Sequence, residues 1–486
     1  MAEQALTTRA ADFAAWYNEV VLRAELADYS PVRGCMVIRP YGYGLWENMQ
    51  RALDDMFKAT GHQNAYFPLF IPQSFIEREK EHVKGFAPEV AVVTHAGGKE
   101  LEEPLVIRPT SETIIYAMFA KWVQSYRDLP LLINQWANVV RWELRTRLFL
   151  RTTEFLWQEG HTAHVTEAEA EEETLRILAI YRTFMEDWMA MPPLTGRKTD
   201  AERFAGALRT YACEALMQDN RALQAGTSHN LGQNFSRQFE LRFQAESGTE
   251  EYAWNTSWGV STRLVGALIM THGDDAGMVA PPRLAPIQVV IVPIYRTDDE
   301  RGAVTGKASE IATALAEQRI RVHIDARDTL KPGPKFYEWE RKGVPLRLEI
   351  GPRDVERGQV MVVARTVTEG AQRKEAVPEL ALAPLLTDRL NAMQRALLEV
   401  ARQRREANSY RGITEYGALR EIIEGAGGFV YAGWCGGDAC EDKVKQETKA
   451  TIRVLPGPEF RSAVMPASCV VCGETARHEA VWARAY

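Results

Sequence analysis

Residues 135–161 read QWANVVRWELRTRLFLRTTEFLWQEGH, and the rest of the chain is arranged around this stretch. Residues 138–143 are rich in β-branched and aromatic side chains, which predicts a strand with Arg141 and Glu143 on one face. An arginine-rich turn follows over residues 144–151, and a second apolar run then returns. The stretch therefore predicts a hairpin with a basic tip. Guanidinium forks match phosphate oxygens and a strand fixes their direction, so this layout favours polyphosphate binding.

An isolated Arg-x-Glu pair is common on a solvated sheet face, but the whole stretch is more specific. It resembles motif 2 of the class II aminoacyl-tRNA synthetases, and within them the prolyl enzymes, through WELRTR and FLRTTEFLWQEGH. The resemblance implies that Arg141 binds the α-phosphate of ATP and the amino-acid carboxylate, that Glu143 belongs to the same nucleotide site, and that Phe155 stacks on adenine. The loop of residues 145–153 would cover the triphosphate and reach toward the tRNA acceptor end. Its ATP-binding residues would be Arg151, Thr152 and Thr153.

A proline pocket is implied by LVIRPTSET, residues 105–113, which resembles the RPTSE segment of the prolyl family. Thr110 and Glu112 would receive the amino group of proline, although a hydroxyl here also suits the cap of the helix expected over residues 114–122. A secondary ammonium needs a carboxylate and an acceptor oxygen inside an apolar pocket. The other residues that the resemblance gives to proline are Trp157, Glu159, His161, His229, Ser257 and Gly259.

Three later segments extend the resemblance. Residues 198–206 resemble a mobile loop that closes over proline, and residues 271–286 resemble motif 3. In motif 3, Arg283 would lie over the γ-phosphate and share a cavity with Arg141. Hydrolase chemistry around His229 is disfavoured, because no G-x-S-x-G elbow accompanies it. The remaining residues expected near ATP are Gln224, Thr227, Ser261 and Arg263.

The length of 486 residues favours several domains. The resemblance implies an α+β fold: a class II antiparallel sheet flanked by helices, then an α/β anticodon-binding domain, then a small zinc-containing α+β domain. Motif 1, at about residues 45–72, would form a homodimer interface, although a core helix packed on a core strand fits the pattern equally. The expected domains are residues 1–283, 284–390 and 391–486.

Residues 335–354 resemble the class IIa anticodon-binding domain, after a β-α-β alternation that itself predicts an α/β domain. By that match Glu340, Arg347 and Arg353 would read anticodon bases. Arginine and glutamate suit guanine and cytosine edges, and each of the three suits a plain surface charge equally well.

Four of the six cysteines form two close pairs, Cys435 with Cys440 and Cys469 with Cys472. Two such pairs meeting across a hairpin predict a structural Zn²⁺ held by four thiolates. Disulfides or free thiols are the alternatives. Zinc is favoured because this cysteine usage, without a signal peptide or an apolar run of roughly 20 residues, fits a reducing cytoplasm and no membrane partner.

A net charge of −7 argues at first against a nucleic-acid partner, but a local basic patch can bind RNA on an acidic protein. The resemblance implies proline–tRNA ligase activity with ATP and Mg²⁺, L-proline and tRNA(Pro), and the gap between residues 161 and 271 is too short for a large editing insertion. The alternatives are a synthetase for threonine, glycine or histidine, and an RNA-binding paralogue without catalysis. A DNA-binding factor is disfavoured, because no basic recognition helix lies beside the cysteines.

Overall fold

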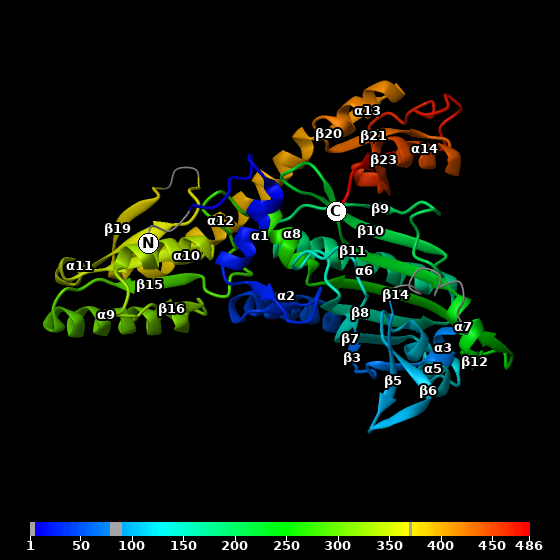
Figure 1. Cartoon of the computed structure of the whole chain (residues 1–486), viewed down its shortest axis with the longest axis horizontal. Coiled ribbons are helices and arrows are strands. Elements are labelled where there is room, and N and C mark those ends of the chain that lie inside the picture. The colour runs from blue at the N-terminus through cyan, green and yellow to red at the C-terminus, as the bar shows by residue number, and fades with distance from the viewer. Residues whose placement is uncertain (1–4, 78–89, 369–371) are drawn as a thin grey trace.

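A large, mainly antiparallel sheet organises the protein, whose computed structural model describes residues 5–77, 90–368 and 372–486 (Figure 1). Within the described residues the sheet has eleven strands, and the β20–β21 and β3–β7 pairs at its two edges are parallel. In spatial order the strands are β20 (Ser409–Ile413), β21 (Phe429–Trp434), β23 (His478–Ala483), β22 (Thr451–Pro456), β9 (Leu194–Arg197), β10 (Arg209–Leu216), β11 (Ala222–Gly232), β14 (Trp254–Ser261), β8 (Glu154–His164), β7 (Leu131–Val140) and β3 (Gln63–Asn64).

The hairpin expected at residues 135–161 is present as β7 and β8, which pair antiparallel along their whole length. The predicted strand over residues 138–143 is wrong at its end, because β7 stops at Val140. Arg141 N still donates to Thr153 O at 2.8 Å, and the chain then leaves the ladder. Arg141 and Glu143 therefore do not share a strand face.

Helix α6 (Glu167–Asp187) covers one face of the central strands. It begins at Thr166, whose hydroxyl accepts a hydrogen bond from Glu169 N at 3.2 Å, and acidic residues in its first turn face the positive end of the helix. The Tyr181 hydroxyl donates to Gln158 Oε1 of β8 at 2.7 Å. Helix α6 does not cover the opposite face of these strands, and a cavity lies there.

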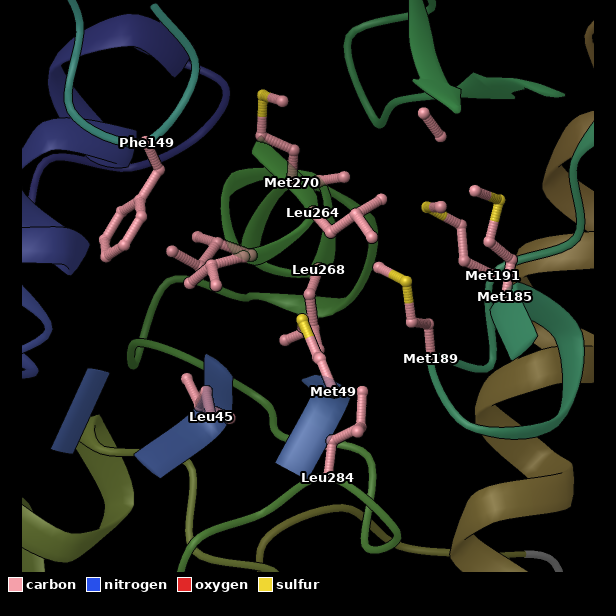
Figure 2. Close-up of a cluster of buried hydrophobic side chains, with 14 of the residues drawn as sticks. Leu45, Met49, Phe149, Met185, Met189, Met191, Leu264, Leu268, Met270 and Leu284 are labelled. Carbon is pink, nitrogen blue, oxygen red and sulfur yellow. The ribbon is translucent and has the colours of Figure 1, made fainter. Parts of the chain in front are cut away.

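The main hydrophobic core joins helices α1 (Phe13–Arg23), α2 (Pro40–Ala59) and α8 (Arg263–His272). In Figure 2, Leu45 and Met49 of α2 lie below Leu268 of α8, and Met185 of α6 lies to the side with Met189 and Met191, which follow that helix. Burying each such side chain contributes about 1.5–3 kcal/mol. Helix α8 is thus fixed, and so is the position of its first residue.

A five-stranded mixed sheet with its own core follows, at the left of Figure 1. The predicted β-α-β alternation is confirmed by β15, α9 and β16. The elements are β15 (Val289–Pro293), α9 (Asp298–Glu317), β16 (Val322–Ile324), α10 (Pro332–Arg341), β17 (Leu346–Ile350), α11 (Pro352–Arg357), β18 (Gln359–Ala364) and β19 (Lys374–Pro378).

The C-terminal region is not a detached unit, because β22 pairs with β9 and so extends the central sheet. Helix α12 (Glu379–Ala407) also runs across the boundary expected at residue 390. The remaining elements are β1 (Ala27–Tyr29), β2 (Met36–Ile38), β4 (Phe70–Pro72), α3 (Gln73–Glu77), β5 (Ala91–Ala96), β6 (Lys99–Ile107), α5 (Glu112–Trp122), α7 (Asn234–Phe239), β12 (Arg242–Gln244), β13 (Glu250–Tyr252), α13 (Tyr416–Glu424) and α14 (Asp438–Thr448). Among the helices described, none is both long and apolar enough to span a bilayer.

Candidate active site

A cavity of about 310 Å³ lies over the face of the large sheet that α6 leaves free. Gln158 contacts α6, so Trp157 and Glu159 on either side of it point the other way. Residues that pair directly across β8, β14 and β11 point to the same side of the sheet. Every second residue of these strands therefore lines the floor of the cavity. These pairs are Trp157 with Ser261, Glu159 with Gly259, His161 with Ser257, Gly259 with Thr227, and Ser257 with His229.

Two guanidinium groups reach this cavity, those of Arg141 and Arg263. Arg141 Nε donates to Pro109 O at 3.0 Å, and its guanidinium carbon lies 5.4 Å from the ring centre of Phe155. Arg263, at the start of α8, donates to Leu150 O at 3.1 Å. Burial lowers the pKa of Arg263, and the charge of Arg141 lowers it further. Two neighbouring cations in a partly dehydrated site attract an anion.

Buried carboxylates line the same cavity. Glu112 is the first residue of α5 and accepts a hydrogen bond from the Thr110 hydroxyl. Glu159 is 1% exposed; it accepts from Gln135 Nε2 at 2.7 Å, and its other oxygen lies 2.9 Å from His161 Nε2. Carboxylates next to guanidinium groups in one cavity suit a ligand with both an ammonium and an anionic group.

The loop between β9 and β10 contributes a wall that the sequence did not predict residue by residue. Glu202 and Phe204 from this loop line the cavity, as does Thr210 at the start of β10. The Phe204 ring stacks on His229, with centroids 4.5 Å apart and planes at 27°. Thr210 Oγ1 lies 3.0 Å from His229 Nδ1. The resemblance of residues 198–206 to a closing loop was the signal that pointed to this wall.

A second cavity of about 510 Å³ adjoins the first and shares Gln224 and Arg263 with it. Glu143 and Arg151 line this second cavity, joined by an ion pair of 2.6 Å. Its other lining residues include Arg145, Arg147 and Tyr486. The structure thus separates Glu143 and Arg151 from the cavity that holds Arg141.

Three predicted ATP residues are not among the lining residues of either cavity. Arg283 lines neither cavity: it is exposed, and its Nη1 donates to Asp187 O at 3.0 Å. Thr152 and Thr153 are buried within the hairpin; the Thr152 hydroxyl donates to Glu154 O, and Thr153 N donates to Gly34 O. The expectation that Arg141 and Arg283 share a cavity is wrong, because Arg283 follows α8 after a proline-rich turn. Arg263, at the junction of a strand and an apolar helix, occupies the cavity instead.

The four predicted metal-ligating cysteines come together in the C-terminal region, all with sulfurs within 4.8 Å of one another. The Cys435 and Cys440 sulfurs are 3.7 Å apart, and those of Cys472 and Cys435 are 3.8 Å apart. A tetrahedral ion about 2.3 Å from each sulfur keeps the sulfurs about 3.8 Å apart. All four are free cysteines, so the disulfide alternative does not hold, and the cluster fits a metal ion.

Two of the three predicted anticodon residues share a surface depression. Glu340 and Arg347 line it together with Arg365 and Arg373. Arg347 lies over the Phe336 ring at 4.2 Å. Arg353, at the start of α11, is exposed and lies outside this depression.

Comparison with known proteins agrees with this geometry. The pattern of the tRNA synthetase class II core domain (G, H, P, S and T) matches residues 93–272, that of the anticodon binding domain matches residues 288–382, and that of the prolyl-tRNA synthetase C-terminal domain matches residues 416–486. The proline–tRNA ligase of Chlorobium phaeovibrioides is 55% identical over 485 residues, 99% of both chains. That of Chloroflexus aurantiacus is 55% identical over an alignment of 488 residues that covers 100% of both chains. That of Prosthecochloris aestuarii is 53% identical over 490 residues.

Proposed function

Because the chain belongs to the prolyl-tRNA synthetase family of class II aminoacyl-tRNA synthetases, we propose that the sheet cavity is where it activates L-proline. Its reaction is that of a proline–tRNA ligase. The proline carboxylate attacks the α-phosphorus of ATP and pyrophosphate leaves, and a terminal ribose hydroxyl of tRNA(Pro) then attacks the prolyl-adenylate and releases AMP. The observation that carries the site assignment is that Arg141 and Arg263 line one cavity with the buried Glu112 and Glu159.

On this assignment the proline ammonium binds Thr110 and Glu112, and its carboxylate binds Arg141. Glu159 and His161 support this polar corner, because each is 1% exposed and bonded to the other. The ring of proline lies among the remaining lining residues of this end of the cavity: Trp157, His229, Ser257 and Gly259.

ATP occupies the rest of the cavity. Its adenine stacks on Phe155, whose ring also lies near the Arg141 guanidinium and the Trp157 ring. We assign the contact with the γ-phosphate, which the sequence had given to Arg283, to Arg263. Arg263 lines the cavity and lies close to Arg141, and both observations support this assignment. Mg²⁺ bound to ATP would add positive charge at the phosphates beside Arg141 and Arg263. The other ATP contacts are Gln224, Thr227 and Ser261, with Glu143 and Arg151 reaching the triphosphate from the second cavity.

No covalent intermediate on the protein is required by this reaction. The strands fix the directions of the floor side chains, which holds the two reactants in line. Preorganised guanidinium groups meet the negative charge that develops on the phosphates as pyrophosphate leaves. The rate enhancement therefore comes from positioning and fixed positive charge.

Transfer RNA contacts two further places. The arginine-rich second cavity, which adjoins the first, takes the acceptor end. Glu340 and Arg347 read anticodon bases from their shared depression, and Arg353 does so from the exposed start of α11, outside that depression. The division into residues 1–283, 284–390 and 391–486 follows the three matched segments, with α12 bridging the last two parts.

An amino-acid panel tests the assignment. Exchange of labelled pyrophosphate into ATP is expected to depend on proline far more strongly than on threonine, glycine or histidine. Stronger exchange with any of these three contradicts the proline assignment, and no exchange with any amino acid supports an RNA-binding paralogue.

Alanine is expected to be activated measurably. The loss of the apolar contacts of a missing ring segment changes binding by only about 1–3 kcal/mol, which is about 10–200-fold. Alanine-dependent exchange should therefore appear at high alanine concentration with a kcat/KM lower than that for proline by about this factor. Exchange that stays at background with saturating alanine contradicts this expectation.

The ion in the cysteine cluster is Zn²⁺ in our proposal, supported by four thiolate ligands at tetrahedral spacing. Bound zinc has a structural role, because four protein ligands leave no open position. Replacing the buried Cys440 with serine is expected to remove the zinc measured by mass spectrometry and to lower the unfolding temperature of the C-terminal region. Cys35→Ser, outside the cluster, is the control and should keep one zinc per chain. Full zinc content in the Cys440 variant contradicts the proposal.

The protein acts as a homodimer in the cytoplasm, on our proposal. Large apolar side chains are exposed around the motif 1 segment, including Tyr66 at 71%, Phe70 at 44% and Trp122 at 45%. Such a group of exposed side chains suits a buried protein interface. Sedimentation should give about twice the chain mass of 54.8 kDa, and Tyr66→Glu should shift the protein toward the monomer. A monomer at micromolar concentration contradicts dimerisation. The cytoplasmic setting is supported by the spacing of the four cysteines, which suits a metal site and not disulfides.

A further inference from the structure

The loop of residues 198–207 links the substrate cavity to the C-terminal region. On its inner side, Glu202 and Phe204 line the cavity, and Phe204 packs on His229. Because both side chains belong to the wall of the proposed proline site, the conformation of this loop sets the shape of that site.

Helix α14 contacts the same loop from the other side. The Thr199 hydroxyl donates to Glu441 Oε1 at 3.0 Å, and Lys445 Nζ forms an ion pair with Glu202 Oε1 at 3.2 Å. Thr199 and Glu441 are each 2% exposed, so their hydrogen bond is shielded from water and strengthened. Glu441 and Lys445 are one helical turn apart and therefore lie on one face of α14.

The position of α14 is itself fixed by the cysteine cluster. Cys440 lies in the first turn of α14 and directly precedes Glu441, the residue that contacts the loop. The buried Lys198 at the start of the loop forms an ion pair with Glu214 at 2.7 Å, which also holds Arg453 of β22. The loop is therefore held at its start through Glu214, which Arg453 also contacts, and along its outer side by Glu441 and Lys445 of α14.

We propose that Glu441 and Lys445 are positioning residues for proline binding: they hold the loop of residues 198–207 closed against the substrate cavity. The inference rests on the assignment of that cavity as the proline site. Neither side chain lines the cavity, and each acts through a loop residue. Through this loop the C-terminal region sets the affinity for proline, whereas the assigned ATP residues lie on β8, β11 and α8 and not on the loop.

Charge reversal at Lys445 is the principal test. In Lys445→Glu the new carboxylate of residue 445 faces Glu202 and the buried Glu441. It repels Glu202 of the loop, which Lys445 attracts in the unmodified protein. We expect the KM for proline in pyrophosphate exchange to rise by about tenfold, while the KM for ATP stays within about twofold. Lys445→Ala, which removes a half-exposed ion pair, should raise the KM for proline by about two- to fivefold. Lys445→Arg, which keeps the charge, should have the KM for proline of the unmodified protein.

A matched control lies on the same helix. Lys443 is exposed and lies 4.9 Å over the Tyr416 ring, away from the loop. Lys443→Glu makes the same change of charge on α14 and should leave the KM for proline unchanged. Thr199→Val, which removes the hydroxyl bonded to Glu441, should raise the KM for proline in the same direction as Lys445→Glu.

The proposal is overturned by an unchanged KM for proline in both Lys445→Glu and Thr199→Val. An equal rise in the KM for ATP, or an equal effect of Lys443→Glu, overturns it as well, because either indicates general destabilisation. Arg141→Ala separates this failure from failure of the site assignment. If the cavity is not the proline site, Arg141→Ala retains exchange; if only the positioning role is wrong, Arg141→Ala is inactive while the Lys445 and Thr199 variants behave as the unmodified protein.

Discussion

Replacing Arg141 with alanine is expected to abolish proline-dependent pyrophosphate exchange and to leave the fold intact. Arg141 is held by Pro109 O and by the rings of Phe155 and Trp157, and it lines the cavity beside the buried acids. It is the cation we assign to both the proline carboxylate and the α-phosphate. Because it meets charge that develops during the reaction, its loss should lower kcat/KM by at least about 10³-fold.

Arg283→Ala is the matched control for this prediction. It removes the same side chain from an exposed position outside both cavities. Its exchange rate should stay within about threefold of the unmodified protein, since surface substitutions away from a site have small effects. Near-normal exchange by Arg141→Ala, or equal losses in the two variants, contradicts the assignment of the cavity. Circular dichroism and thermal unfolding of both variants check that the fold is retained.

Replacing Glu214 with alanine is expected to give the largest loss of stability. Glu214 is fully buried in β10; it accepts from Lys198 Nζ at 2.7 Å, and from Arg453 through Nε at 3.1 Å and Nη2 at 2.9 Å. Its removal leaves two buried cations without a counter-charge, which costs about 3–5 kcal/mol. The midpoint of urea unfolding should fall accordingly. Arg420→Ala, which breaks an exposed pair with Glu424, should change stability by less than about 1 kcal/mol.

The same carboxylate predicts a dependence of stability on pH. Burial raises the pKa of Glu214, but Arg453 and Lys198 outweigh burial and hold that pKa below its ordinary value. A folded-state pKa below the unfolded value of about 4.3 means that Glu214 stabilises the fold above that pH. This contribution is lost as the pH falls through the folded-state pKa. In Glu214→Gln the acid-side loss of stability should be smaller than in the unmodified protein, and an identical pH profile contradicts the mechanism.

The sequence was informative wherever function imposes a local pattern. The hairpin of β7 and β8, the β-α-β start of the second sheet and the two cysteine pairs each depend on residues close in the chain. Alternation along β8 alone places Trp157, Glu159 and His161 on one face without any long-range information.

Other features depend on packing between segments that are far apart in the chain, and the sequence did not predict them. Arg283 and Arg263 both lie in segments that resemble the family, and only the packing of α8 determines that Arg263 enters the cavity. The walls from Glu202 and Phe204 depend on where a loop folds over the sheet. The pairing of β22 with β9 joins residues more than two hundred positions apart, which no local pattern encodes.

Strand β9 has a neighbour on each side, β10 on one and β22 on the other. A chain ending before β20 would present the backbone N–H and C=O groups of β9 to solvent, and an uncovered edge of this kind recruits strands from other molecules. Covering that edge protects the catalytic sheet against aggregation. Shortened forms of this protein should therefore be lost to precipitation before any chemical defect becomes visible.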